Sequence, residues 1–339
     1  MYSLIRPLLF RLAPEHAHSL TLRLIQMAGV LPVVNRMLVH AFGGSDRPVD
    51  AFGLHFKNPV GLAAGYDKDG LGWRGLASLG FGHIEIGTVT LKAQPGNPRP
   101  RVFRLPEERA LVNRMGFPGV GAQAVARRLT HRRPRRLVLG VNIGKNKDTP
   151  LEMADQDYLA LIKIFYPLAD YLAVNVSSPN TVGLRRLQAR DALDNLLSSL
   201  AEERVTQVRI LGKTTPILVK LAPDLTDGEL DDALAAIQGN GMDGVIATNT
   251  TLSREGIKSP VAQEAGGLSG APLTRRSRAM VEKITRRTTG QLPVIGAGGI
   301  MTPADAQAMF DAGAILVQVY TGLIYAGPSL VNNILKEAQ

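Results

Sequence analysis

Eight short apolar runs constrain the fold of this chain more than any other feature of its sequence. They cover residues 59–64, 83–87, 137–143, 171–176, 217–222, 244–249, 293–298 and 314–320. Each run is hydrophobic almost throughout rather than alternating, which is typical of parallel strands buried on both faces. Helical stretches, such as residues 226–238 and 274–287, lie between most of the runs. Because eight β–α alternations fit a closed barrel better than an open doubly wound sheet, the pattern predicts an α/β fold of the (β/α)8 TIM-barrel type.

The first forty-five residues follow a different pattern. Apolar residues recur at helical spacing over residues 5–12 and 17–28, and Pro14 begins the second of these segments. Glycine and proline residues mark its end, and residues 43–48 resemble a linker. We therefore predict a two-helix N-terminal extension at residues 1–45, followed by a barrel domain at residues 46–339. That length accommodates a barrel of roughly 250 residues with insertions.

Composition excludes several classes of protein. The chain has no cysteine, which excludes a disulfide scaffold, a cysteine-ligated zinc or iron–sulfur site and a cysteine base, and we predict no metal site. The net charge of +10 is compatible with nucleic acid, an anionic membrane or anionic ligands. The densest basic run, residues 127–136, has no interleaved aromatic side chains on which bases could stack. We therefore expect a solvated helix end there and no nucleic-acid partner.

The N-terminal extension is apolar but too short to cross a membrane. No uninterrupted apolar stretch reaches 18 residues, so no transmembrane helix is predicted. Arg6, Arg11 and Glu15 interrupt the apolar segment before a signal-peptide core could form. We expect the extension to lie on a membrane surface rather than to span the bilayer.

Polar residues and glycines follow every predicted strand. They are Gly65, Asp67, Lys68 and Asp69; Thr88; Asn142, Gly144 and Lys145; Asn175, Ser177, Ser178 and Asn180; Lys220; Thr248, Asn249 and Thr250; Gly298 and Gly299; and Tyr320, Thr321 and Gly322. Turns and helix caps account for the glycines. They do not account for the lysines and asparagines, because buried polar groups need partners. Since the active site of a (β/α)8 barrel forms at this end of the strands, we expect a ligand site here.

Two of these strand ends suit a phosphate group. The sequence GAGGI covers residues 296–300, and Tyr320, Thr321 and Gly322 follow the eighth run. Glycine lets backbone N–H groups approach an anion, and the N-terminus of a following helix adds a favourable dipole. The loops after strands seven and eight are also the usual phosphate site of this fold.

Lys220, near the end of the fifth run, is compatible with two kinds of chemistry. As a neutral amine it could form a Schiff base, as in an aldolase or isomerase. As a cation it could stabilise negative charge, such as that of a reduced flavin. The nearby Asn142, Asn175 and Thr248 offer donors and acceptors to the polar edge of a planar ring, which favours the second use.

Eight longer motifs resemble those of one family. They are AAGYDKDG (63–70), NRMGF (113–117), VNIGKN (141–146), NVSSPNTVGLR (175–185), VKLAPD (219–224), TNTT (248–251), GGLSG (266–270) and GAGGI (296–300). Together they resemble the class 2 dihydroorotate dehydrogenases, which are membrane-associated and reduce quinones. The resemblance extends over the whole chain. It implies a barrel with one FMN per chain that oxidises dihydroorotate to orotate in pyrimidine biosynthesis, with a membrane quinone as electron acceptor.

The resemblance also assigns individual residues. FMN would be lined by Ala64, Gly65, Tyr66, Asp67, Lys68, Thr88, Asn142, Asn175, Lys220, Thr248, Gly270, Gly299, Tyr320 and Thr321. The substrate would be held by Lys68, Asn113, Arg114, Met115, Gly116, Phe117, Asn175, Asn180, Asn249 and Thr250. Ser178 would be the catalytic base, and His18, Arg104 and Tyr320 would lie at the quinone site. Tyr66 departs from the family, in which we expect leucine or phenylalanine at this position.

The residue types fit the implied chemistry. Forming a C=C bond in the substrate ring requires the loss of a proton from one carbon and of a hydride from its neighbour. Flavin accepts the hydride, so the protein must supply the base. A serine hydroxyl is a weak base, so Ser178 needs a proton relay, to which Thr181 could belong. The soluble classes of the family use a cysteine base, so a cysteine-free chain with N-terminal helices matches the quinone class.

By the same resemblance we expect a monomer bound peripherally to the cytoplasmic face of a bacterial inner membrane, with the anionic membrane surface as a partner and no signal or transit peptide. Three alternatives stay open. One is a different FMN oxidoreductase, the second is a Schiff-base lyase that uses Lys220, and the third is a non-enzymatic membrane-surface module formed by the N-terminal helices. A bound flavin would exclude the second and the third.

Overall fold

A computed structural model describes residues 2–338 and contains a closed barrel of eight parallel strands. In barrel order, which is also chain order, the strands are β3 (Val60–Leu62), β4 (His83–Val89), β7 (Val138–Ile143), β8 (Tyr171–Asn175), β9 (Ile217–Leu221), β10 (Gly244–Ala247), β12 (Val294–Ala297) and β13 (Leu316–Val319). Each strand coincides with one of the eight apolar runs. The predicted TIM barrel is therefore confirmed. The strand residues are buried because the barrel interior covers one face and the helices cover the other.

Helices surround the barrel. They are α4 (Trp73–Leu76), α5 (Ala122–Leu129), α6 (Ala154–Phe165), α7 (Arg190–Leu211), α8 (Asp227–Gly239), α9 (Thr274–Arg287), α10 (Pro303–Asp311), α11 (Thr321–Ala326) and α12 (Ser329–Glu337). The two helical stretches predicted at residues 226–238 and 274–287 correspond to α8 and α9. A capping box fixes the start of α8, because Thr226 and Glu229 each accept the backbone N–H of the other, at 2.8 Å for the Glu229 carboxylate and 3.3 Å for the Thr226 hydroxyl.

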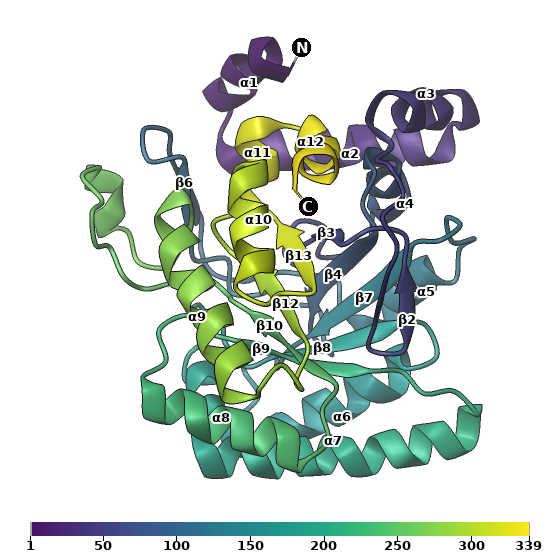
Figure 1. The fold of residues 1–339 in the computed structure, drawn as a ribbon, viewed down its shortest axis with the longest axis vertical. Coiled ribbons are helices and arrows are strands. Elements are labelled where there is room, and N and C mark those ends of the chain that lie inside the picture. The colour runs from purple at the N-terminus through teal and green to yellow at the C-terminus, as the bar shows by residue number, and fades with distance from the viewer. Residues whose placement is uncertain (1, 339) are drawn as a thin grey trace.

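The N-terminal extension contains three helices, where the sequence pattern predicted two. They are α1 (Tyr2–Arg11), α2 (Pro14–Val30) and α3 (Pro32–Phe42). Pro32, interpreted from sequence as the end of the second helix, instead occupies the first turn of α3, where no N–H donor is needed. Figure 1 shows α1, α2 and α3 together at one end of the molecule, with α7 and α8 at the opposite end. The outer limits of the two predicted domains, residues 1 and 339, lie outside the described residues.

Two small sheets lie outside the barrel. A hairpin of β1 (Val49–Ala51) and β2 (Leu54–Phe56) places Phe56 in a buried cluster with Tyr171 and Leu218, so it closes the amino-terminal end of the barrel. The strands β5 (Val102–Leu105), β6 (Ala110–Asn113) and β11 (Gly267–Gly270) form an antiparallel sheet. Arg104 of β5 donates to the carbonyl of Leu12 at 2.7 Å. This second sheet therefore connects the barrel rim to the extension.

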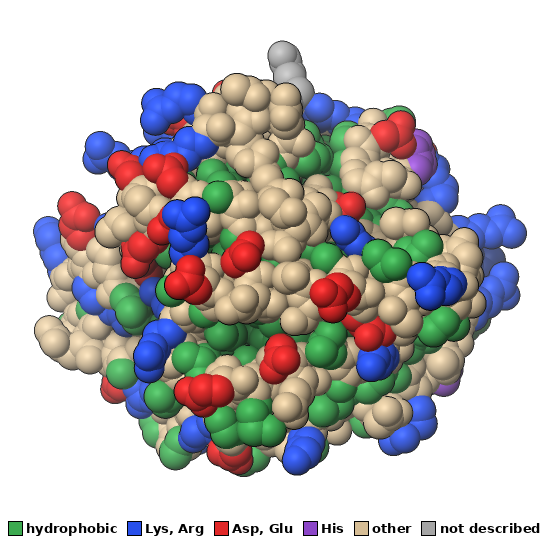
Figure 2. Space-filling model, turned by 90° about the horizontal axis from the view of Figure 1, so that it is seen from below, with side chains coloured by type: hydrophobic (Ala, Val, Ile, Leu, Met, Phe, Trp, Pro, Cys, Tyr) green, Lys and Arg blue, Asp and Glu red, His purple; other side chains and the backbone are tan. Residues whose placement is uncertain are grey.

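Apolar side chains are exposed mainly on the extension. Of the large hydrophobic residues exposed among those described, these lie on or next to α1, α2 and α3: Leu4, Ile5, Leu8, Leu12, Leu20, Leu24, Met27, Val30, Leu31, Val33, Val34, Met37 and Val39. The opposite face differs, since Figure 2 shows acidic and basic side chains spread among scattered apolar ones. Within residues 2–338 no single helix is long and apolar enough to cross a membrane, although α2 and α3, bent by 109°, pass that test as a pair.

Candidate active site

One cavity of about 1070 Å³ lies between the carboxyl ends of the barrel strands and the N-terminal extension. Polar residues and glycines that follow the strands line its barrel side. Its other side is apolar and is formed by side chains such as Leu9, Phe10, Leu22, Ile25 and Phe42 of the extension. The cavity therefore joins the polar strand ends to an apolar chamber beneath the three N-terminal helices.

Most of the predicted site residues line this cavity. They are Ala64, Gly65, Tyr66, Lys68, Thr88, Asn175, Lys220, Thr248, Gly270, Gly299, Tyr320 and Thr321 of the cofactor set; Asn113, Met115, Gly116, Phe117, Asn180, Asn249 and Thr250 of the substrate set; the predicted base Ser178; and His18 and Arg104 of the quinone set. Three predicted residues, Asp67, Asn142 and Arg114, are not part of the lining. Residues far apart in the sequence thus meet around one cavity.

The side chains of Asp67 and Arg114 have partners away from the cavity. The Asp67 carboxylate accepts the two backbone N–H groups of residues 71–72, both at 2.8 Å, and burial raises the pKa of this carboxyl to about 6. The Arg114 guanidinium pairs with Glu264 and lies 4.6 Å from the centre of the Phe103 ring. The structure therefore brings neither side chain to the cavity, and both stabilise the loops that surround it.

A hydrogen-bonded network lies beneath the polar half of the cavity. Asn142 donates to the Glu85 carboxylate at 2.8 Å and accepts from the Thr88 hydroxyl at 2.5 Å and from the Asn175 amide at 3.2 Å. The Glu85 carboxylate is also 3.7 Å from the ammonium group of Lys220. All five residues are buried. Asn142 therefore acts through Thr88 and Asn175, whose side chains reach the cavity.

The other oxygen of Glu85 has partners deeper in the barrel. It accepts from the Tyr171 hydroxyl at 3.0 Å and from the Gln318 amide at 2.8 Å. Below them, burial lowers the pKa of His83 to about 3, so this imidazole is neutral. The side-chain oxygen of Gln318, which borders the cavity, has no hydrogen-bond partner among the described residues. It is therefore an acceptor that a bound group could use.

Aromatic rings lie where the polar and apolar halves of the cavity meet. The Tyr66 ring is edge-on to His18 at 5.0 Å and to Tyr320 at 5.8 Å. Burial, reinforced by the neighbouring Lys68, lowers the pKa of His18 to about 4, so the imidazole is neutral. Burial also lowers the pKa of Lys68 to about 8, although the carboxylate of Asp69 opposes this. His18 is thus a half-buried cavity residue rather than an ordinary surface histidine.

Ser178 follows β8 and is only 4% exposed. Its hydroxyl oxygen accepts the backbone N–H of Asn180 at 3.2 Å. The adjacent Ser177 donates to the Asn175 side chain at 3.1 Å and accepts from the Asn249 amide at 3.0 Å. Ser177, Asn175 and Asn249 therefore form one hydrogen-bonded unit at the ends of β8 and β10, and the predicted base is the next residue along the chain.

The predicted phosphate corner contains glycines that tolerate no side chain. A Cβ atom on Gly299 would lie 2.3 Å from the backbone of Thr274, and Gly270 has a φ of +97°. At the start of α10 the Asp305 carboxylate accepts the N–H of Met301 at 3.0 Å and, with Thr302, caps the helix. The α11 N-terminus at Thr321 also borders the cavity, so this corner offers backbone N–H groups and a hydroxyl to an anion.

Comparisons with known proteins agree with this architecture. A family model described as dihydroorotate dehydrogenase matches residues 48–339. A protein of Roseiflexus sp. (strain RS-1) named dihydroorotate dehydrogenase (quinone) is 52% identical over 336 residues, which are 98% of this chain and 92% of the relative. The chain belongs to the dihydroorotate dehydrogenase family. Its relatives place it in the quinone-dependent class 2 of that family.

Two further matches support the same family. A protein of Acidithiobacillus ferrooxidans with the same name is 50% identical over 99% of this chain and 94% of its own. A crystal structure of the Eimeria tenella dihydroorotate dehydrogenase in complex with ferulenol superposes with a TM-score of 0.88 at 40% identity, over 96% of this chain and 90% of that one. Because this structure covers 96% of the chain, the match extends beyond the barrel into the N-terminal helices.

Several residues of the site escaped the sequence-based prediction. Glu85, Tyr171 and Gln318 lie inside apolar strand runs, where a single polar residue gives little signal. Glu85 did offer a clue, because it lies in an apolar run expected to be buried on both faces, and a buried charge needs a partner. Arg185 and Asp224 are the last residues of two of the family motifs, but the resemblance assigned no role to them. Their contacts link three strand-end loops.

Proposed function

We propose that this dehydrogenase oxidises dihydroorotate to orotate at the polar half of the cavity and delivers the electrons to a quinone in the apolar half. The observation that carries the proposal is the single cavity of about 1070 Å³ that joins the two halves. The family supports the activity, since the curated relatives are named for it. A substrate that is polar and an acceptor that is largely hydrocarbon would each meet a matching wall.

The cofactor of this proposal is FMN, one per chain. The site fits it, because the phosphate corner at Gly270 and Gly299 leaves room only for backbone, and the buried oxygen of Gln318 lacks a partner. Lys220 and the cavity-facing Asn175 would hold the polar edge of the ring. FMN, when bound, supplies the acceptor for the hydride that leaves the substrate.

Lys220 argues against the Schiff-base alternative. Its ammonium group is ion-paired with the buried Glu85 carboxylate at 3.7 Å, which fits a retained positive charge better than a neutral nucleophile. A cation here would stabilise negative charge on a neighbouring ring. Failure of borohydride to trap a carbonyl adduct at Lys220 would agree with this assignment.

The substrate ring would lie among the amides at the strand ends. Asn113, Asn175, Asn180 and Asn249 line the cavity and offer donors and acceptors that match the amide edges of a pyrimidine ring. Lys68 faces the same cavity and would pair with the substrate carboxylate. These contacts would hold the ring so that its reacting carbon faces Ser178.

Ser178 would be the base that removes the proton. Its hydroxyl is buried and has one backbone donor, so it can accept a proton only if its own proton leaves by a relay. The hydroxyl of Thr181 is buried and has no hydrogen-bond partner among the described residues. A water molecule between Ser178 and Thr181 would complete such a relay.

The quinone would enter beneath the extension, near His18, Arg104 and Tyr320. These residues line the cavity, and His18 and Tyr320 flank Tyr66 where its polar and apolar halves meet. The exposed apolar side chains of α1, α2 and α3 would contact the lipid from which the quinone comes. We further propose peripheral binding at the cytoplasmic face of the inner membrane, anionic lipid as a partner, and a monomer in which residues 1–45 contribute the quinone passage and residues 46–339 the chemistry.

The decisive experiment is anaerobic addition of dihydroorotate to the purified protein, followed through the visible flavin absorbance. The unsubstituted protein should bleach. Ser178→Ala should retain FMN and bind orotate, yet bleach at least about a hundredfold more slowly, which is the usual scale for a positioned acid–base group. Ser199→Ala, on α7 and bonded only within its own helix, is the matched control. A near-normal rate for Ser178→Ala would remove that residue from the role of base.

A further inference from the structure

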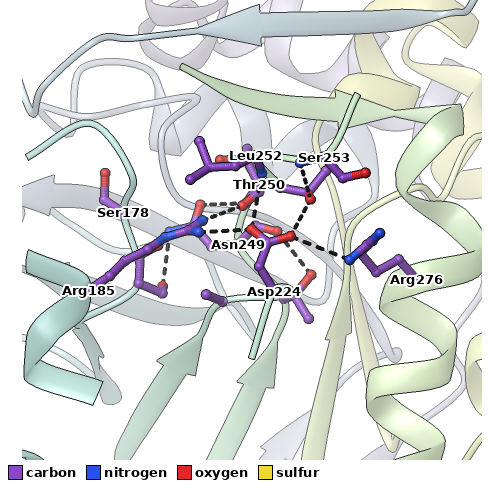
Figure 3. Close-up of polar contacts among 12 residues, drawn as sticks. Ser178, Arg185, Asp224, Asn249, Thr250, Leu252, Ser253 and Arg276 are labelled. Atoms are coloured by element: carbon purple, nitrogen blue, oxygen red, sulfur yellow. Dashed lines mark hydrogen bonds and ion pairs between the residues drawn. The ribbon is translucent and has the colours of Figure 1, made fainter. Parts of the chain in front are cut away.

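One guanidinium group lies at the junction of three strand-end loops. Arg185 donates through Nε to the carbonyl of Ser177 at 3.0 Å and through Nη2 to the carbonyl of Thr250 at 2.9 Å. Its Nη1 atom pairs with the Asp224 carboxylate at 2.8 Å. Figure 3 shows Arg185 reaching from its own segment toward Thr250 and Asp224. A single side chain therefore ties together the loops that follow β8, β9 and β10.

The two carbonyls belong to the residues next to the predicted chemistry. Ser177 precedes the proposed base Ser178, and Thr250 follows the substrate-lining Asn249. Farther along the loop that carries Ser178, Asn180 donates to Asn113 at 3.2 Å, whereas Val182 is 86% exposed. A change in the position of the guanidinium would therefore shift the base relative to the substrate amides.

Asp224 fixes the orientation of Arg185 and is itself held in place. Its carboxylate accepts the backbone N–H of Leu252 at 3.0 Å and the hydroxyl of Thr251. Arg276 of α9 approaches the same carboxylate at 3.7 Å, and in Figure 3 it lies on the side opposite Arg185. The carboxylate thus has donors that do not depend on Arg185. The guanidinium is held against a fixed partner in a planar hydrogen-bonding geometry that lysine cannot reproduce.

Arg185 does not contact the substrate itself. It is absent from the residues that line the cavity, and all three of its nitrogen atoms donate to loop carbonyls or to Asp224. Lys68, in contrast, lines the cavity. A role for Arg185 in the reaction must therefore be exerted through the position of the loops.

We propose that Arg185 and Asp224 are positioning residues. Together they form a clamp that fixes the loop carrying Ser178 relative to Asn249 and Thr250. The proposal rests on the proposed function, in which Ser178 is the base. An error of about 1 Å in the placement of a reacting group can lower a rate about a hundredfold, so a clamp of this kind affects the chemical step. The phosphate corner at Gly270 and Gly299 lies elsewhere, so FMN should be retained when the contact is lost.

The test compares Arg185→Gln, Arg185→Lys and Asp224→Asn with Arg186→Gln. Arg186 is the exposed neighbour in the same short helix, and its side chain forms no hydrogen bond or ion pair with any residue of the described range 2–338, so it is the matched control. FMN content and melting temperature show that each variant is folded. Arg185→Gln should bleach with dihydroorotate about tenfold to a hundredfold more slowly, whereas Arg186→Gln should match the unsubstituted protein. Arg185→Lys should not restore the rate. Unchanged bleaching by folded Arg185→Gln would overturn the proposal.

A second readout separates positioning from a general loss of stability. In the Ser178→Ala background, Arg185→Gln should slow bleaching by much less than it does in the presence of the serine, because residues that act as a unit are not additive. The same factor in both backgrounds would contradict the clamp. Failure of the base assignment is recognised separately, by a near-normal rate for Ser178→Ala alone.

Amide hydrogen exchange tests the loop without using the reaction. In Arg185→Gln and Asp224→Asn, residues 177–183 should exchange faster than in the unsubstituted protein, while the strands β8 and β10 keep their protection. Arg186→Gln should leave the exchange of this loop unchanged. Equal exchange in all four proteins would overturn the clamp, whatever the identity of the base.

Discussion

Lys68 lines the cavity, and its ammonium group donates to the carbonyl of Gly65 at 2.5 Å. Burial and charge have opposite effects on its pKa. Burial, the largest cause, lowers its pKa to about 8, and the nearby Arg101 acts in the same direction. The carboxylates of Asp69 and Glu15 raise the pKa. Below about pH 8 the free protein therefore presents a cation to an anionic substrate, and above this pH it presents a neutral amine.

This balance predicts a pH dependence for orotate binding. The dissociation constant should be flat from pH 6.5 to about 7.5 and then rise, approaching tenfold per pH unit, because each binding event above the pKa of Lys68 must take up one proton. Titration of the flavin absorbance with orotate between pH 6.5 and 9 measures it. Lys68→Met should bind orotate more weakly and show no inflection near pH 8. A dissociation constant that stays flat up to pH 9 in the unsubstituted protein would show that Lys68 is not the carboxylate partner.

At the residue scale, the residues that line the cavity were easier to predict from the sequence than the buried polar residues that hydrogen-bond beneath them. Ser178, Asn175 and Lys220 follow or end apolar runs, so their position at the strand ends could be inferred from the barrel alone. Glu85 could not, because its partners at Asn142 and Gln318 come from other strands and only the closed barrel brings them together. Long-range polar pairing of this kind leaves no periodic signal in a single sequence.

At the scale of elements, α2 lies on the barrel through two glycines. A Cβ atom on Gly75 of α4 would lie 2.0 Å from the carbonyl oxygen of Ile25, and one on Gly29 would lie 2.5 Å from the backbone nitrogen of Gly75. The two helices therefore pack backbone against backbone. This close approach, with the Arg101–Glu15 ion pair at 3.1 Å, holds the extension over the cavity.

Gly75→Ala should loosen this contact. The added methyl group has no space, and overpacking of this kind typically destabilises a protein by about 1–3 kcal/mol. The melting temperature and the rate of quinone reduction should both fall, while bleaching by dihydroorotate should persist because the substrate residues lie on the barrel. Gly228→Ala in α8, where a Cβ atom meets nothing within 4 Å, is the control and should be neutral or slightly stabilising. A folded Gly75→Ala protein with normal quinone turnover and an unchanged melting temperature would contradict this account.

The elements that the sequence pattern missed lack the signal that identified the barrel strands. Strands β5, β6 and β11 form a sheet whose third strand, Gly267–Gly270, comes from a distant part of the chain and is rich in glycine. Helix α3 was missed because Pro32 ends one helix pattern and begins another. The barrel strands were recognised because burial on both faces makes them hydrophobic throughout. The three short strands β5, β6 and β11 each contain polar residues or glycine and therefore lack that signal.

At the scale of the whole molecule, the two ends have different surfaces. Leu8 and Met37 of the extension are 61% and 65% exposed, and they belong to a larger set of exposed apolar side chains on α1, α2 and α3. Four arginines of the extension, Arg6, Arg11, Arg23 and Arg36, would contribute roughly 1 kcal/mol each near an anionic surface. Burial of the apolar set in lipid should contribute more, at about 25 cal/mol per Å² of apolar surface.

Vesicle binding tests this comparison. The double variant Leu8→Asp/Met37→Asp removes two exposed apolar side chains and adds two negative charges, so its affinity for anionic vesicles should fall at least about tenfold. Its bleaching by dihydroorotate in detergent should be normal. The control, Val205→Asp/Ile210→Asp, changes side chains that are 57% and 67% exposed on α7, at the opposite end of the molecule in Figure 1, and should bind vesicles normally.

Because apolar burial dominates, high salt should remove the unsubstituted protein from vesicles only partly. Equal binding by the two double variants would show that the extension is not the membrane-facing surface, and complete release by salt would show that the arginines, rather than the apolar side chains, hold the protein there.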